Sequence, residues 1–183
     1  MFIDITLKIT PEMSADAKKI TSKELVGHLG THFDAMDKEF PLEYTKRKGV
    51  IFDVSGVEGR DIDLCDIDIT RVKENTFVAF YTGYIEKVPY GSKTYFSEHP
   101  QLSYELINTL LDKKISIIGI DFGGIRRTPE HIPADQLCAD KSTFVVENLC
   151  NLKSLLNHTF TAHTYPMNFT HLTGLPCRVI AEI

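Results

Sequence analysis

The stretch ISIIGIDF, residues 115 to 122, is almost entirely apolar on both faces until Asp121, its first charged residue. A strand exposed on one side alternates apolar with polar residues, so this run indicates a central strand with both faces buried. Residues 100–114, just before it, have the apolar spacing and terminal basic residues of an amphipathic helix. Asp121 precedes Gly123 and Gly124, which favours a turn, although the carboxyl ends of such strands also tend to hold sites.

Further short runs are rich in β-branched and aromatic residues and are bounded by turn residues. They predict strands over residues 2–9, 49–57, 76–84, 143–149, 160–169 and 177–183. A shorter helix is predicted over residues 133–141 and another turn or helix over residues 152–157, and the alternation in DIDLCDIDIT (61–70) predicts an amphipathic strand. Many strands and few helices predict one α/β domain, residues 1–183, built around a sheet or barrel.

The composition is typical of a soluble globular domain, with 43% hydrophobic and 25% charged residues in 183. No apolar run approaches the ~20 residues that span a bilayer, and the first residues lack the pattern of a secretory signal. We therefore expect a cytoplasmic protein without a membrane partner, whose four widely spaced cysteines are reduced. The net charge of −5 disfavours nucleic-acid binding, which needs a basic face.

The segment HLGTHFDA, residues 28–35, carries two imidazoles and a carboxylate on His28, His32 and Asp34. A straight strand would spread these side chains over ~20 Å, too far to share an ion, at ~3.3 Å per residue. A bend at Gly30, which glycine permits, would bring them together. Two interpretations stay open: a site suited to zinc, manganese or iron, or a polar strand end whose histidines bond to the backbone.

Glu147 lies in TFVVENL, residues 143–149, a run that otherwise has the character of a buried strand. Burying a carboxylate is costly unless it is paired or bound to a cation. Glu147 is therefore either a metal ligand or the partner of Arg71, Arg126 or Arg178 in a salt bridge.

At these residues the chain resembles the cyclase-type metal-dependent hydrolases, a family that includes bacterial kynurenine formamidase and isatin hydrolase. HLGTHFDA is similar to the family segment H-x-G-T-H-x-D-A, and VVENLCNL (145–152) to its E-N-L-x-N-L-like strand. The order of other segments is collinear with the family: IDITLKITPEM (3–13), IIGIDFGG (117–124) and YPMNFTHLTGLPCRVIAEI (165–183). The similarity covers nearly the whole chain.

The resemblance implies a compact α/β domain with a β-rich, barrel-like core and a few flanking helices. It implies a divalent metal, with Zn²⁺ expected first and Mn²⁺ as the alternative, held by His28, His32, Asp34 and Glu147. Family members with two zincs add a histidine twelve positions before the glutamate, where this chain has Asp135; one or two ions are therefore expected. The resemblance also implies a homodimer or homotetramer that acts on a small-molecule substrate.

Three positions depart from the family pattern. Kynurenine formamidases place an acid/base histidine ten residues after the first ligand, where this chain has Lys38, and they use a tryptophan, which this chain lacks. Gly123 and Gly124 replace the serine after the G-I-D turn. We expect hydrolysis of an amide, formamide or lactam C–N bond, with Lys38 stabilising the oxyanion or protonating the leaving nitrogen, unless it is a solvated loop lysine. The alternative is a catalytically degenerate metal-binding homologue with a binding or assembly role.

Overall fold

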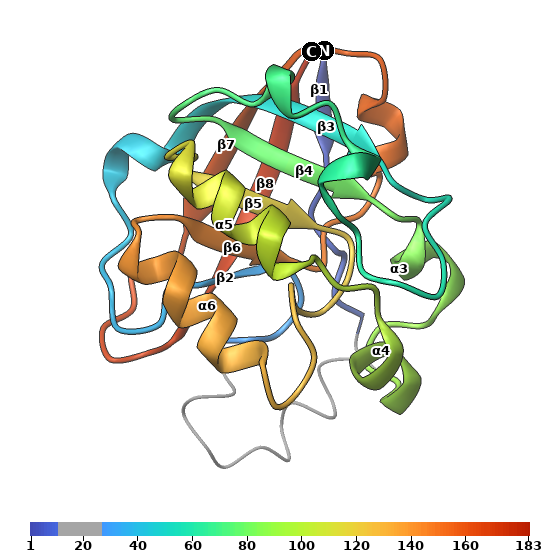
Figure 1. Cartoon of the computed structure of the whole chain (residues 1–183). Helices are drawn as coiled ribbons and strands as arrows, with labels where there is room; N and C mark the ends of the chain where they lie inside the picture. Colours follow the sequence, from blue (N-terminus) through green and yellow to red (C-terminus); the bar gives the residue numbers. More distant parts are fainter. Residues whose placement is uncertain (11–26) are drawn as a thin grey trace.

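The computed structural model describes residues 1–10 and 27–183, and within them a mixed β-sheet closes on itself (Figure 1). The order around the ring is β8 (Gly174–Glu182), β2 (His32–Asp34), β6 (Phe144–Glu147), β5 (Ile117–Ile120), β4 (Phe77–Tyr81), β3 (Lys46–Asp53) and β7 (Phe160–Pro166), and β7 pairs back with β8. The short strand β1 (Phe2–Asp4) adds to β8 outside the ring. The barrel-like core is therefore confirmed, while residues 11–13 of the family-like opening segment lie outside the described residues.

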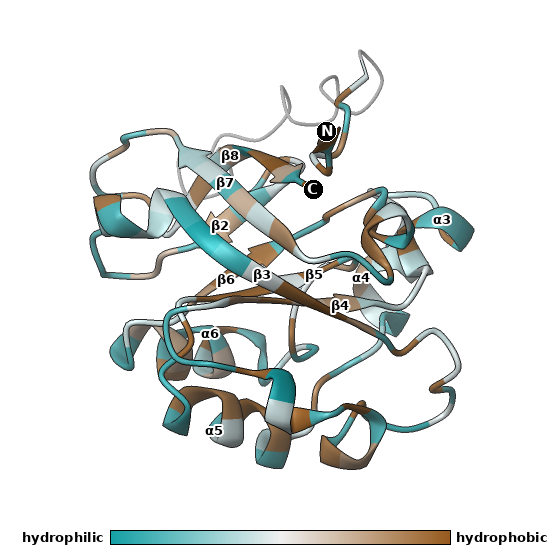
Figure 2. Cartoon of the chain, turned by 90° about the horizontal axis from the view of Figure 1, so that it is seen from above, coloured by the Kyte–Doolittle hydropathy of each residue, from teal (hydrophilic) through white to brown (hydrophobic). Residues whose placement is uncertain are grey.

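The apolar run over residues 115–122 contains β5, which pairs in parallel with β4 on one side and β6 on the other. Ile117 packs inside the barrel, whereas Ile118 and Ile120 pack in a second core on its outer face. This outer face is covered by α5 (Tyr104–Asp112) and α6 (His131–Asp140), which lie together on one side of the sheet in Figure 2. Both faces of β5 are thus buried, as the apolar run predicts.

The helices predicted over residues 100–114 and 133–141 are present with shifted ends as α5 and α6, and the turn or helix predicted over residues 152–157 is the 3₁₀ turn η4 (Leu152–Leu155). α5 begins after Ser103, whose hydroxyl oxygen accepts a hydrogen bond from the backbone N–H of Leu106 at 3.0 Å. α6 begins two residues before the predicted start, which has consequences for the site. Two short helices, α3 (Tyr84–Lys87) and α4 (Lys93–Glu98), were not predicted. No helix in the described ranges has the length and apolar character needed to cross a membrane.

The strand predicted over residues 61–70 is wrong. The structure has two 3₁₀ turns there, η2 (Leu64–Asp66) and η3 (Ile69–Arg71). The Asp66 carboxylate accepts a hydrogen bond from the backbone N–H of Asp63 at 2.8 Å, and the carboxylate of Asp68 accepts one from Thr70 at 3.1 Å. Aspartates that bond nearby backbone groups offer the chain an alternative to a β-ladder, and here that alternative is adopted.

Candidate metal centre

His32, Asp34 and Glu147 point to the same face of the barrel. His32 and Glu147 lie directly opposite each other on the paired strands β2 and β6. Phe33 and Val146, at the alternate positions, pack in the barrel interior. Because successive side chains of a strand point to opposite faces, the histidine and the two carboxylates lie on the outer face, beside α6.

The bend expected at Gly30 is present, and it brings His28 to Asp34. Gly30 adopts a φ of +71°, a conformation that favours glycine. The Nε2 atom of His28 lies 3.3 Å from Oδ1 of Asp34, and Nε2 of His32 lies 3.7 Å from the same oxygen. The three residues of the HLGTHFDA segment therefore form one cluster.

Helix α6 contributes a histidine and a carboxylate from successive turns. Nε2 of His131 lies 3.1 Å from Oδ2 of Asp135 and 3.6 Å from Oε1 of Glu147. Glu147 in turn reaches His32, with 3.5 Å between Oε2 and Nε2. The donors fall into two groups that share Asp34: His28, His32 and Asp34 form one, and Asp34, His131, Asp135 and Glu147 form the other.

The spacing of these donors fits a cation at their centre. Donors at ~2.1 Å from a tetrahedral ion are separated by about 3.4 Å. The five nitrogen-to-oxygen distances above run from 3.1 to 3.7 Å, close to that value. The donor set, imidazole nitrogen with carboxylate oxygen, suits zinc or manganese.

The carboxylates of the cluster are buried without enough partners. Oδ2 of Asp34, Oδ1 of Asp135 and Oε1 of Glu147 have no hydrogen-bond partner among the described residues. Burial and the charges of Asp34 and Asp135 raise the pKa of Glu147 well above its usual range, and burial and Asp34 raise the pKa of Asp135 to about 6. A divalent cation would satisfy the unpaired oxygens and offset the repulsion between like charges.

A hydrogen-bond network fixes the orientation of His32. Its Nδ1 lies 2.8 Å from the carbonyl oxygen of Gly30, which also accepts a bond from the amide of Asn148 at 2.9 Å. The hydroxyl of Tyr95 donates to the other side of that amide at 2.8 Å. Since a carbonyl only accepts, Nδ1 of His32 carries a proton, and Nε2 is the ring nitrogen directed at Asp34 and Glu147. Nε2 is therefore the atom that would bind a cation.

The cluster is open to solvent on its histidine side. The side chains of His28 and His131 are 28% and 31% exposed, whereas those of Asp34 and Glu147 are 3% and 4% exposed. A purely structural metal site would be closed. In the described part of the chain, the two histidines therefore form the solvent-facing side of the cluster.

His131 was not among the residues selected from the sequence. The predicted helix began at residue 133, which left His131 in a loop, whereas α6 begins at His131 itself. The available signal was the four-residue spacing from His131 to Asp135, which places both on one helix face.

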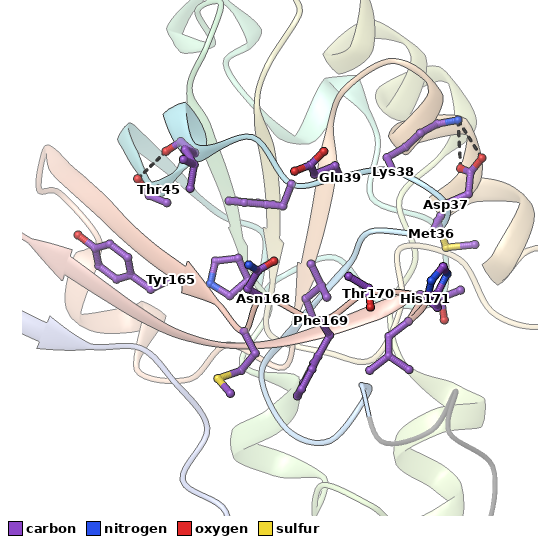
Figure 3. A pocket seen from close by; sticks show the side chains of 17 residues that line it. Met36, Asp37, Lys38, Glu39, Thr45, Tyr165, Asn168, Phe169, Thr170 and His171 are labelled. Atoms are coloured by element: carbon purple, nitrogen blue, oxygen red, sulfur yellow. Dashed lines mark hydrogen bonds and ion pairs between the residues drawn. The ribbon is translucent and has the colours of Figure 1, made fainter.

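Lys38 lies outside both groups of donors. Its ammonium pairs with Asp140 at 2.8 Å and with Asp37 at 3.0 Å. It lines a cavity of about 910 Å³ between residues 36–45 and 165–175, where Figure 3 shows it directed toward Asp37. The hydrogen bonds to Asp140 and Asp37 raise the pKa of Lys38. Its catalytic role stays a prediction.

The arginines considered as partners of Glu147 are engaged elsewhere. Arg126 pairs with Asp61 and Glu130, Arg178 pairs with Asp4, and the guanidinium of Arg71 lies over the ring of Phe52. Among the described residues, the ion pairs of Glu147 are those with His32 and His131. The salt-bridge interpretation is therefore not what the structure shows.

Asp121 is buried, but its carboxylate serves the fold. It accepts hydrogen bonds from the backbone N–H groups of Thr82 and Gly83, at 3.0 and 2.7 Å, and from the Thr82 hydroxyl at 2.5 Å. Burial raises its pKa to about 6. The turn interpretation holds, because these bonds join the end of β5 to the turn after β4.

The sequence matches the family model described as "Putative cyclase" over residues 3–126, which is more than half of the chain. The chain belongs to the putative cyclase family. No curated protein matches the sequence significantly.

Solved structures share the fold of this cyclase-family chain. One is described as a predicted metal-dependent hydrolase from Bacillus stearothermophilus; it is 23% identical, with 99% of this chain and 97% of that chain covered and a TM-score of 0.77. A potential metal-dependent hydrolase with cyclase activity is 23% identical, with coverage of 99% and 96% and a TM-score of 0.80. Isatin hydrolase A from Labrenzia aggregata, bound to benzyl benzoate, is 19% identical, with coverage of 99% and 93% and a TM-score of 0.75.

Proposed function

We propose that this cyclase-family protein is a metal-dependent hydrolase that cleaves an amide, formamide or lactam C–N bond of a small molecule. The observation that carries the proposal is the cluster of buried carboxylates with unpaired oxygens, set among imidazole nitrogens at metal-donor spacing. The names of the structural neighbours, which include metal-dependent hydrolase and isatin hydrolase, support the same class.

The proposed ligands are His28, His32, Asp34, Asp135 and Glu147. A bound divalent cation, Zn²⁺ or Mn²⁺, supplies a water of lowered pKa and polarises the substrate carbonyl. The chain orients these donors: the Gly30 carbonyl holds Nδ1 of His32, so that Nε2 faces the carboxylates, and the Asp34 carboxylate is shared by both groups of donors.

Proton transfer in the reaction needs a group that can hold a proton near neutral pH. Glu147 and Asp135 are proposed ligands, and a bound cation would keep both carboxylates ionised. Lys38, which lies outside both groups of donors, is therefore kept as the proposed proton donor.

The protein is also proposed to assemble as a homodimer or homotetramer in the cytoplasm. Large apolar side chains are exposed beside the cavity of Figure 3: Leu42, Tyr165, Met167 and Phe169. Apolar side chains gathered on one surface are a common mark of an interface between proteins.

The test is hydrolysis of N-aryl formamides, lactams and cyclic imides by protein that has been stripped with a chelator and reloaded with Zn²⁺ or Mn²⁺. We expect turnover of at least one class by the reloaded protein and its loss in Asp34→Asn, which removes the carboxylate shared by both donor groups. Asp53→Asn, at an exposed carboxylate, is the matched control. Metal binding without turnover of any of these classes would favour the degenerate, non-catalytic alternative.

A further inference from the structure

We infer that His131 is a ligand of a second cation, held with Asp34, Asp135 and Glu147, and that Gly124 is the residue that gives its ring the room to bind. The inference rests on the proposed metal-dependent function. It goes beyond that function by assigning two residues that the sequence patterns do not point to.

The first argument is the direction of the His131 ring. Its Nε2 atom lies between two carboxylates, 3.1 Å from Asp135 and 3.6 Å from Glu147. Asp135 comes from the next turn of α6, whereas Glu147 comes from β6. The ring nitrogen of His131 therefore faces carboxylates from two different elements, as a ligand of a cation bound between them would.

The second argument is the balance of donors in this group. Without His131 it consists of the carboxylates of Asp34, Asp135 and Glu147, each nearly fully buried and each with an oxygen that lacks a hydrogen bond. A neutral imidazole adds a donor without adding negative charge. It also supplies a nitrogen ligand, which zinc favours. A set of carboxylate oxygens alone would instead suit magnesium or calcium.

The third argument is the close approach of Gly124. A Cβ built on this residue would lie 2.8 Å from Nδ1 and Cε1 of His131 and 2.8 Å from the backbone carbonyl oxygen of Arg126, which is shorter than real contacts allow. Gly124 also has a φ of +128°, which favours glycine. A side chain at position 124 would therefore crowd both the imidazole, at its present place beside the carboxylates, and the Arg126 carbonyl.

Metal titration of the stripped protein with Zn²⁺ and Mn²⁺ tests the role of His131. We expect the wild-type protein to bind two ions and His131→Gln to lose at least tenfold in affinity for one of them, as much as the loss of an outer-shell partner typically costs. The matched control is His163→Gln, because His163 pairs with Glu182 at 2.9 Å in the β7–β8 pair, outside both groups of donors. X-ray absorption of the zinc-loaded proteins should show fewer imidazole ligands per zinc in His131→Gln alone.

Chemical rescue separates a ligand from a residue with a structural role. Added imidazole should restore the second cation to His131→Ala, because a free imidazole can fill the space and donate its nitrogen. A histidine that merely packs or pairs on the helix would give no such rescue.

The role of Gly124 is tested against another glycine with a positive φ. Gly124→Ala should weaken binding of the second cation, whereas Gly59→Ala should not, because Gly59 has a φ of +69° but a Cβ there would meet nothing within 4 Å. In the His131→Ala background, Gly124→Ala should weaken cation binding less than it does in the wild type, because only the contact with the Arg126 carbonyl and the φ of +128° then remain. Equal effects of Gly124→Ala in both backgrounds would overturn the coupling of the two residues.

The outcomes separate this inference from the proposed function. Two bound ions in both wild-type and His131→Gln, with unchanged affinity, would overturn the inference and leave the hydrolase proposal intact. Binding that depends on His131, without turnover of any C–N substrate, would support the inference and contradict the hydrolase. No metal bound by the wild-type protein would overturn both.

Discussion

At the scale of single residues, the orientation of His32 depends on groups that do not touch the proposed metal. The Tyr95 hydroxyl bonds to Asn148, and Asn148 bonds to the same Gly30 carbonyl that holds Nδ1 of His32. Outer groups of this kind fix the tautomer and the direction of a metal-binding imidazole. Substitution of Tyr95 therefore tests whether the orientation of the His32 imidazole affects metal binding.

We expect Tyr95→Phe to weaken metal binding about tenfold and to lower the free energy of unfolding by about 1–3 kcal/mol, because a buried amide oxygen loses its donor. Metal titration and urea unfolding would measure the two effects. Tyr44→Phe is the matched control: Tyr44 donates to the carbonyl of Ser142 at 2.9 Å, outside the His32 network. Equal losses of metal affinity in both variants would contradict the role of the network.

His99 should make the stability of the protein depend on pH. It is fully buried, stacks on Phe122 and has Nδ1 2.8 Å from the carbonyl of Pro100. Burial lowers its pKa from 6.5 to about 4. Between these values the unfolded chain binds more protons than the folded one, so stability is full above pH 6.5 and falls as the pH drops toward 4.

For the metal-free protein, we expect this histidine to contribute a loss of about 2 kcal/mol in the free energy of unfolding between pH 7.5 and pH 5. Urea unfolding at the two pH values, compared between wild type and His99→Gln, isolates the contribution. The variant should show a smaller loss by that amount. Parallel pH dependences would show that His99 is not held neutral by the fold.

The sequence allowed much of the candidate site to be selected. His28, His32, Asp34, Asp135 and Glu147 were chosen from motif spacing and resemblance, and the structure brings them together. His131 escaped selection because its contribution depends on where a helix begins, and the ends of helices are the least predictable part of a sequence pattern.

At the scale of elements, the site depends on how α6 is joined to the loop after β2. The Lys38 ammonium and the Gln136 amide each contact both Asp37 and Asp140. Asp37 and Lys38 lie in the loop after β2, whereas Gln136 and Asp140 lie on α6. This loop continues from Asp34, and this helix carries Asp135. The bridge therefore connects the segments that bring the two carboxylates together.

We expect Lys38→Met to weaken metal binding by no more than about fivefold, because exposed ion pairs contribute little, and Lys38→Arg to retain the affinity. With saturating metal, turnover by both variants should match the wild type if Lys38 acts only through this bridge. A large fall in kcat for both, with unchanged metal content, would instead support the proton-transfer role expected from the sequence.

The elements that the sequence predicted well are those with both faces buried. β4, β5 and β6 follow from apolar runs, because nothing in such runs competes with the ladder. β2 has three residues and two polar side chains, so no strand pattern was visible, and it is set by its partners β6 and β8. The strand predicted over residues 61–70 is absent because its aspartate carboxylates accept hydrogen bonds from nearby backbone N–H groups. These local bonds prevail over the alternation of polar and apolar residues that suggested a strand.

At the scale of the whole molecule, the chain encloses its core by closing the sheet, yet it leaves an apolar surface beside the cavity of Figure 3.

If this surface is the contact between copies, replacing Tyr165 and Met167 together with serine should raise the dissociation constant of the dimer at least tenfold, since large side chains at the centre of an interface dominate its energy. Sedimentation velocity would measure it. Ile132→Ser, at an equally exposed apolar residue on α6, should leave the assembly unchanged. A wild-type protein that is monomeric at all concentrations would contradict the proposal.

The most direct test of the account is the metal content of the purified protein, measured by elemental mass spectrometry after loading with zinc or manganese. We predict one or two ions per chain in the wild type and none in Asp34→Asn, which loses the carboxylate shared by both groups of donors. Asp121→Asn, at a buried carboxylate already bonded by Thr82 and Gly83, should keep its metal if circular dichroism shows that it is folded. A wild-type protein that binds no metal after loading, or an Asp34→Asn protein that binds as much as wild type, would contradict the central claim.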